Sequence, residues 1–237
     1  MPITSNNLQT TRSETAATSY SLSSYAVSPG SNRMLVVRVH AMRTSEADFT
    51  LSATFNSVSM SEAVTVTRSG SSRWWRTTIF YLIAPDETTA DVVVSSSATL
   101  AGIIIAGETL HGAAQASPIG AIDTDSVSAA DVALTLTGCA SNSWIFAAAS
   151  SNSGGPPSWS WSGATENYDL ASAGSDTSEV AGSGAAVETS GGDVSITATR
   201  SGSANHHIAV GAEIKAAATG GLVVPIFSHY YRQLATV

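Results

Sequence analysis

Apolar and polar residues alternate with a period of two along much of this chain. The alternation is plain in the segments 35–41, 49–55, 132–136, 194–198 and 208–214. Because successive side chains of a strand point to opposite faces, this pattern predicts strands with one face in a core and the other in water. The polar positions carry Ser and Thr more often than charged residues, which suits the surface of a sheet.

Further segments are apolar enough to be predicted as strands, although their alternation is less regular. They are 19–27, 64–68, 74–83, 90–96, 101–109, 143–149 and 179–188. Clusters of Gly, Pro, Ser and Asn separate them, and helical spacing is scarce before residue 220. About ten to twelve short strands, with no helices for parallel crossovers, predict an all-β, antiparallel sandwich or barrel.

The sequence contains a faint internal repeat. Ser31 precedes one predicted strand and Ser141 precedes another, an offset of 110 residues. Gly107 and Gly211 occupy comparable places in two apolar strands, an offset of 104 residues. The repeat indicates two related halves, which form one sandwich or two small β-domains, unless Ser-, Val- and Ala-rich strands resemble one another by chance. The halves would span 19–112 and 125–216.

The two ends differ from the body of the chain. Residues 1–18 are polar and unpatterned, and we predict that they form an N-terminal arm beside a β-sandwich of 19–218. Residues 219–237 begin with a Gly pair that predicts a hinge and continue as an apolar, aromatic segment. This segment must fold onto its own domain or dock on a partner, and we expect docking because exposed aromatic patches mark interfaces. The docking candidates are Leu222, Val224, Pro225, Ile226, Phe227, Tyr230, Tyr231 and Leu234.

Composition narrows the class of protein. Only 12% of the 237 residues are charged, and the net charge is −8. The nine Arg and one Lys form no basic cluster, so we expect no nucleic-acid partner. The apolar runs are too short to span a bilayer, and the N-terminus lacks the apolar stretch of a signal peptide. The single Cys excludes an internal disulfide and a Cys-based zinc site.

Catalytic and metal-binding motifs are poor. The chain has no Gly-x-Ser-x-Gly elbow, no phosphate-binding loop and no His-Glu-x-x-His motif, so we expect no enzyme activity and no cofactor. His206 and His207 adjoin in a predicted strand, so their side chains point to opposite faces and cannot bind one metal ion together.

Carboxylates are scattered along the chain. Asp123, Asp125 and Asp131 have the oxygen ligands that Ca²⁺ takes, but their spacing lacks the Gly turn and closing Glu of an EF-hand loop. We therefore expect them to hold backbone amides at turns and strand edges. Glu108 and Glu213 stand near the ends of two apolar strands, where we expect them to be solvated.

Aromatic residues offer one candidate ligand site. Trp159 and Trp161 would face the same way in an extended segment, and Tyr168 follows shortly after them. Such a platform stacks on sugar rings, which makes the three residues candidates for glycan binding. The alternative is a Trp pair that covers the end of a core poor in large residues.

Three segments carry a resemblance to a known class of proteins. They are Glu108-Thr-Leu-His-Gly-Ala-Ala-Gln-Ala-Ser-Pro-Ile-Gly120, Pro29-Gly-Ser-Asn-Arg-Met-Leu-Val-Val37, and a stretch from Trp75 that ends in Tyr-Leu-Ile-Ala-Pro85. In these segments the chain resembles the jelly-roll β-sandwich modules of tailed-bacteriophage virion proteins and of some bacterial surface proteins. The resemblance covers about residues 19–216 and brings no catalytic residues with it.

The resemblance implies a non-enzymatic structural protein of a bacteriophage particle. Decoration (cement) and head-fibre proteins of this kind sit on the particle and are attached by terminal segments. The implied partners are other virion proteins such as the major capsid protein, together with further copies of this chain, a trimer being one arrangement. The implied location is the virion, with synthesis in the host cytoplasm. A carbohydrate-binding module, with a host glycan as ligand, is the alternative.

Overall fold

The structure is a computed structural model that describes residues 2–128, 131–152, 158–172, 180–201 and 206–218. These residues form seventeen strands and no helix, and every strand pairing is antiparallel. The prediction of an all-β, antiparallel sandwich is therefore confirmed. No helix in the described part of the chain has the length and apolar character needed to cross a membrane.

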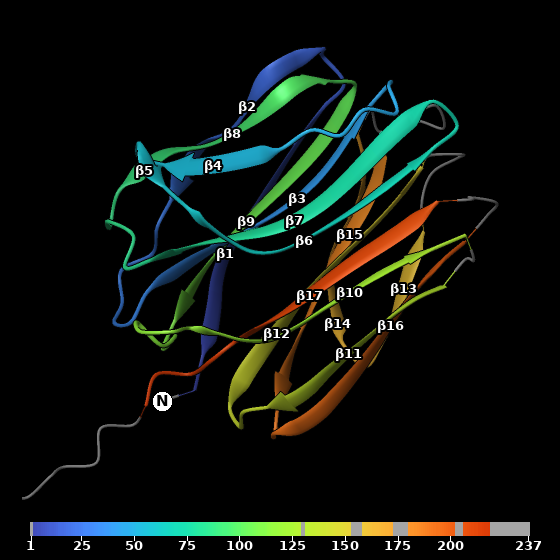
Figure 1. Cartoon of the computed structure of the whole chain (residues 1–237). Helices are drawn as coiled ribbons and strands as arrows, with labels where there is room; N and C mark the ends of the chain where they lie inside the picture. Colours follow the sequence, from blue (N-terminus) through green and yellow to red (C-terminus); the bar gives the residue numbers. More distant parts are fainter. Residues whose placement is uncertain (1, 129–130, 153–157, 173–179, 202–205, 219–237) are drawn as a thin grey trace, which may run out of the picture.

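The first half of the chain forms two facing sheets (Figure 1). Its strands are β1 (Thr4–Ser13), β2 (Ala17–Ala26), β3 (Met34–Arg43), β4 (Leu51–Phe55), β5 (Val58–Ser59), β6 (Ser61–Gly70), β7 (Arg73–Ile83), β8 (Thr89–Leu100) and β9 (Gly102–His111). Sheet A has the order β1-β9-β3-β7-β6, and sheet B has the order β2-β8-β4-β5.

The second half repeats this arrangement. Its strands are β10 (Ile119–Val127), β11 (Asp131–Cys139), β12 (Ser143–Asn152), β13 (Trp159–Ser162), β14 (Thr165–Ala171), β15 (Val180–Thr189), β16 (Gly192–Arg200) and β17 (His207–Ile214). Sheet C has the order β10-β17-β12-β15-β14, and sheet D has the order β11-β16-β13. Strand for strand this is the order of the first half, with β5 alone lacking a described counterpart. In both halves, consecutive strands cross mostly from one sheet to the facing sheet, which is the connectivity of a jelly roll.

The four sheets stack as layers in the order B, A, C, D (Figure 1). One apolar core fills the space between A and B, and another fills the space between C and D. A third group of apolar side chains joins sheet A to sheet C. The two sandwiches therefore share a buried interface made by their five-stranded sheets.

This layering corrects one feature of the predicted strands. Segment 35–41 was expected to bury one face only, but nine of the ten residues of β3 are buried. Both faces of sheet A are covered, one by sheet B and the other by sheet C, and a strand covered on both sides is apolar on both sides. Met34 and Val36 signalled this second buried face.

The N-terminal arm expected at 1–18 is wrong. Residues Thr4–Ser13 pair with β9 as the edge strand of sheet A, and β2 already begins at Ala17. Their exposure alternates between exposed and intermediate, so neither face has an apolar pattern that sequence reasoning could detect. Backbone hydrogen bonds place this strand, and Ile3 anchors its start in the interface between the sandwiches. Strands β10, β13 and β14 were not predicted either. The hinge and docking segment expected at 219–237 lies outside the described residues.

Candidate functional site

The interface between sheets A and C contains a group of buried polar side chains. Arg38 and His40 come from β3, and Glu108 comes from the neighbouring strand β9. Asn167 and Tyr168 come from β14 of the second half. We call these five residues the Arg38 cluster. Elsewhere the interface is largely apolar, so the cluster is its main chemical feature.

Arg38 makes contacts in both halves of the molecule. One guanidinium nitrogen, Nη2, donates to Glu108 Oε2 at 2.7 Å, and both side chains are almost completely buried. The other, Nη1, donates to Asn167 Oδ1 at 3.0 Å and to the Ala185 carbonyl at 3.3 Å. The guanidinium carbon also lies 4.9 Å from the Tyr168 ring centroid, a cation–π contact. Ser5 donates a hydrogen bond to the other carboxylate oxygen of Glu108. Polar groups from both halves therefore form hydrogen bonds to this buried ion pair.

His40 and Tyr168 form the second part of the cluster. The His40 Nε2 atom lies 2.9 Å from the Tyr168 hydroxyl. Burial, with a smaller contribution from the Arg38 charge, lowers the pKa of His40 to about 3. Burial likewise raises the pKa of Tyr168 to about 12. Both groups are therefore neutral at neutral pH, and His40 Nδ1 finds no hydrogen-bond partner among the described residues.

Two glycines of β15 provide the room for these rings. A Cβ atom at Gly182 would lie 2.6 Å from His40 Cγ, and a Cβ atom at Gly184 would lie 2.4 Å from Tyr168 Cε1. Real Cβ atoms do not approach other atoms so closely, so a side chain at either position would displace the ring. Gly182 is thus matched to His40 of the other half, and Gly184 is matched to Tyr168 of its own half.

The contacts of the Arg38 cluster indicate a structural role. Its charged and titratable groups contact one another in the interior of the molecule, whereas the reacting groups of a binding or catalytic site line a cleft that a ligand can enter. Within the described ranges, no group of three or more His, Cys, Asp and Glu residues could hold a metal ion.

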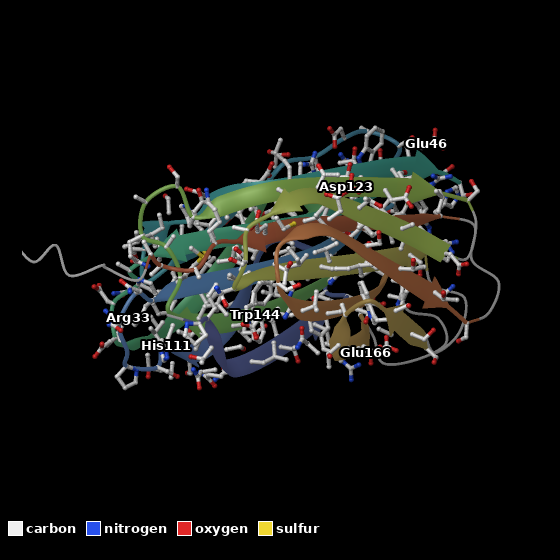
Figure 2. All side chains as sticks on the ribbon, turned by 90° about the horizontal axis from the view of Figure 1, so that it is seen from below. Arg33, Glu46, His111, Asp123, Trp144 and Glu166 are labelled. Carbon is white, nitrogen blue, oxygen red and sulfur yellow. The ribbon has the colours of Figure 1, made fainter. Side chains whose placement is uncertain are left out.

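The carboxylates of the second half hold backbone amides. Asp125 accepts from the Ala133 amide at 2.8 Å, and Asp123 accepts from the Thr135 amide at 2.6 Å. Figure 2 labels Asp123, which lies on the edge strand β10. The expectation that these aspartates bind strand-edge amides is confirmed for both; Asp131 is exposed in β11.

The expectation that Glu108 and Glu213 are solvated is wrong. Each side chain belongs to a residue that is 2% exposed. Glu108 pairs with Arg38 as described above. Glu213 accepts from the backbone amides of Ala121, at 2.8 Å, and Ala140, at 2.7 Å. Both lie in central strands of five-stranded sheets, where no water reaches, so each carboxylate needs protein donors.

The three glycan-binding candidates do not form an exposed platform. Trp159 is 4% exposed and packs in the core between sheets C and D. Tyr168 is 7% exposed and points into the Arg38 cluster. Trp161 is half-buried, and its indole nitrogen donates to Ser183 Oγ at 2.9 Å. Trp159 and Trp161 do share a face, but that face points inward, where the two rings pack with small residues such as Ala147 and Ala198 in the core between sheets C and D.

The eight docking candidates in 222–237 lie outside the described residues. The last residues before this segment are placed, however, at one end of the molecule. The Ala217 amide donates to the Gly112 carbonyl at 2.7 Å, and a hollow of about 470 Å³ is lined there by Ala216–Ala218 and by the linker between the halves. Arg33 and His111 lie at this same end (Figure 2).

Sequence reasoning did not find the Arg38 cluster. The only signal was that Arg38 and His40 interrupt an otherwise apolar strand face of Met34, Val36 and Met42. A charged residue on a face that is apolar on either side of it is a candidate for a buried pair. Its partner Glu108 interrupts the apolar face of β9 in the same way.

Comparisons with known proteins do not identify a family. No family model matches the chain, and no curated protein matches its sequence. A solved structure described as the crystal structure of Cucumber Necrosis Virus aligns with 79% of this chain and 72% of its own, with 8% identity and a TM-score of 0.26. A likeness this low carries no argument about fold or function. The assignment of the chain to an all-β, sandwich-like class rests on its own strand order.

Proposed function

We propose that this protein is a non-enzymatic structural component of a virus particle, and more specifically a decoration or cement protein on the capsid of a tailed bacteriophage. The observation that carries the proposal is the duplicated jelly-roll strand order, in which two sandwiches are joined through their five-stranded sheets. Jelly rolls are a common fold of viral capsid domains. The Arg38 cluster supports a structural role because its charge pair, Arg38 and Glu108, is buried and Arg38 also donates to Asn167 of the other half.

The surface chemistry supports the same role. Outward positions of sheets B and D carry mostly hydroxyl side chains, among them Ser21, Ser52, Thr135 and Ser195. A weakly charged hydroxyl-rich surface suits a component that faces water over a wide area and does not bind nucleic acid.

Attachment is assigned to the C-terminal segment alone, because the N-terminus is used as strand β1. Segment 219–237 follows the placed residues Ala216–Ala218 at one end of the molecule. Its apolar side chains would contribute roughly 25 cal/mol per Å² of apolar area buried on a neighbouring capsid subunit, before the cost of ordering the segment. Further copies of this chain on the same lattice, as a trimer for example, would add to this attachment.

Deletion of the segment tests the proposed attachment. The full chain and a version ending at Ala218 are mixed with undecorated phage particles and sedimented. We expect the full chain to sediment with the particles and the shortened chain to stay in the supernatant with its β-sheet circular dichroism unchanged. Equal occupancy of both versions would refute the attachment through 219–237.

A further inference from the structure

Part of the interface between the two sandwiches is built from reciprocal strand contacts. Strand β7 contacts β17, and the corresponding strands β15 and β9 also contact each other. Strand β7 contacts β12, as the corresponding β15 contacts β3, while β3 and β12 correspond to each other and are in contact. An interface whose contacts come in such reciprocal pairs is the kind made by two equal subunits related by a two-fold axis. Around these strands the halves therefore pair as a dimer would, whereas the contacts of β6 with β10 and β17 have no counterpart of equal extent.

The paired registers show which residues occupy corresponding positions. Val37 pairs with Gly107 and Phe80, and Ala147 pairs with Gly211 and Ala185. Counting residues along the paired strands from these positions gives the equivalent positions of the two halves. Arg38 corresponds to Ala148, His40 to Ser150, Glu108 to Ala212, Thr77 to Gly182, Ile79 to Gly184, and Val64 to Tyr168.

The chemistry at these positions is not symmetric. On one side of the two-fold axis, His40 of the first half lies over Gly182, and Arg38 lies over the Tyr168 ring, which itself covers Gly184. On the other side, the equivalent positions hold Ala, Val and Ile, and a Thr77–Ser150 hydroxyl pair at 2.5 Å takes the place of His40 and Gly182. Around the Arg38 cluster, the interface is therefore two-fold in its strand contacts and asymmetric in its side chains.

This asymmetry opposes pairing of like halves. In a pair of first halves, His40 would meet Thr77 where it now meets Gly182, and a Cβ atom at that place lies 2.6 Å from the ring. Arg38 would meet Val64 in place of the Tyr168 ring and would lose the Asn167 acceptor. In a pair of second halves, Ala148 would face the Tyr168 ring and Ser150 would face Gly182, which leaves a void and the Tyr168 hydroxyl without His40 as its partner. Clashes, unpaired charges and voids are how interfaces reject wrong partners.

We infer that the Arg38 cluster, with Gly182 opposite His40 and Gly184 beneath Tyr168, determines the specificity of pairing. These residues make the inner face of sheet A recognise sheet C and reject a second sheet A. The partner that fits this surface is the second half of this same chain, which carries sheet C. A buried charge pair contributes little net stability when it replaces apolar packing, and its best-supported use is to specify one arrangement among several. Specific pairing matters for a duplicated chain, because many identical halves meet while the protein is being made.

A double-mutant cycle in the intact chain tests this inference. Gly182→Thr places a first-half residue opposite His40, and His40→Ser places a second-half residue opposite position 182. We expect Gly182→Thr to lower the midpoint of thermal unfolding sharply. The double variant G182T/H40S should recover much of the loss, because it recreates the Thr77–Ser150 pair on the other side of the axis. Additive losses in the double variant would overturn the inference.

A second experiment measures pairing directly. A protease site is inserted between Ala116 and Ser117, which are exposed in the linker, and the folded protein is cleaved. The halves are dissociated in denaturant and allowed to reassociate, and native mass spectrometry counts the like and unlike pairs. We expect unlike pairs in roughly tenfold excess over statistical pairing or more. A statistical mixture, or halves that remain single, would overturn the inference.

The variant R38A/H40S/E108A gives the first half the second-half residues at the cluster, so pairs of first halves should now appear. Leu110→Ile is the matched control. It also introduces the equivalent second-half residue, Ile214, but away from the cluster, and should leave the preference for unlike pairs unchanged.

Discussion

A few buried polar residues account for most of the chemistry inside this molecule. Arg38, Glu108 and Glu213 are charged groups in strands that are otherwise apolar, and each finds donors or acceptors on other elements. Removing one member of such a set leaves the other desolvated without compensation, which costs more than the intact pair contributes. The effects of mutations should therefore depend on whether partners are removed singly or together.

Substitution of Arg38 tests this expectation. Arg38→Met leaves the Glu108 carboxylate buried without its cation, and we expect a loss of about 3–5 kcal/mol in the free energy of unfolding by urea denaturation. The double variant R38M/E108L removes both charges and should lie much closer to the wild type. Glu87→Leu is the control, because it removes the exposed partner of the Arg33–Glu87 pair while Arg33 keeps its hydrogen bonds to the Gly30 and Pro85 carbonyls, and it should cost less than about 1 kcal/mol. A loss in R38M no larger than in E87L would contradict the role given to the cluster.

His40 predicts how stability depends on pH. Its pKa falls from 6.5 to about 3 on folding, so the unfolded chain takes up a proton first as the pH falls. The contribution of neutral His40 is fully present above pH 6.5 and is lost between pH 6.5 and about 3, at about 1.4 kcal/mol per pH unit. Urea denaturation across this range should show a shallower slope in His40→Gln than in wild type. His111→Gln, which keeps His40, is the control, and equal slopes in His40→Gln and wild type would refute the assignment.

Individual strands show where sequence patterns are sufficient and where they fail. Segments such as 208–214 were predicted because a buried face makes them alternate or makes them wholly apolar. Strand β1 was missed because its position depends on backbone pairing with β9, which leaves no apolar pattern. The platform expected at Trp159 failed for a different reason. Alternation shows that two side chains share a face, but only the tertiary structure decides which face is buried.

The edge strand β10 offers a test at the scale of one element. Asp123 and Asp125 join the edge of sheet C to β11 of sheet D by accepting backbone amide hydrogens. Alanine at either position should cost about 1 kcal/mol of unfolding free energy at most, since the exposed amides of Ala133 and Thr135 can be rehydrated. Asp131→Ala, on the exposed face of β11, is the control and should change the free energy by less than about 0.5 kcal/mol. Equal effects in all three variants would show that the bridge contributes nothing.

The whole molecule is two sandwiches joined by a third buried layer. The faint sequence repeat pointed to related halves, but the sequence could not show that the five-stranded sheets of those halves face each other. The facing of these sheets depends on single residues such as Gly182, which leaves room for His40 of the other sheet. The role of such a residue can be recognised only when the facing sheet is known. Because the shared layer includes apolar residues of both halves, unfolding one half would expose part of the other's surface.

The shared layer predicts cooperative unfolding. The full chain should unfold in one transition, with the same midpoint by intrinsic fluorescence and by circular dichroism. In differential scanning calorimetry, the calorimetric enthalpy of unfolding should equal the van't Hoff enthalpy of the same transition. Two resolved transitions would show that the halves are energetically independent.

The central claim, a structural protein that decorates a capsid, is tested most directly by the stoichiometry of binding to particles. Increasing amounts of the full chain are added to a fixed amount of undecorated particles, and the pelleted protein is quantified against the major capsid protein. The account predicts saturation at a fixed ratio of this chain to the major capsid protein, as repeated lattice sites require. Absence from the pellet, or uptake that rises without saturation, would contradict it.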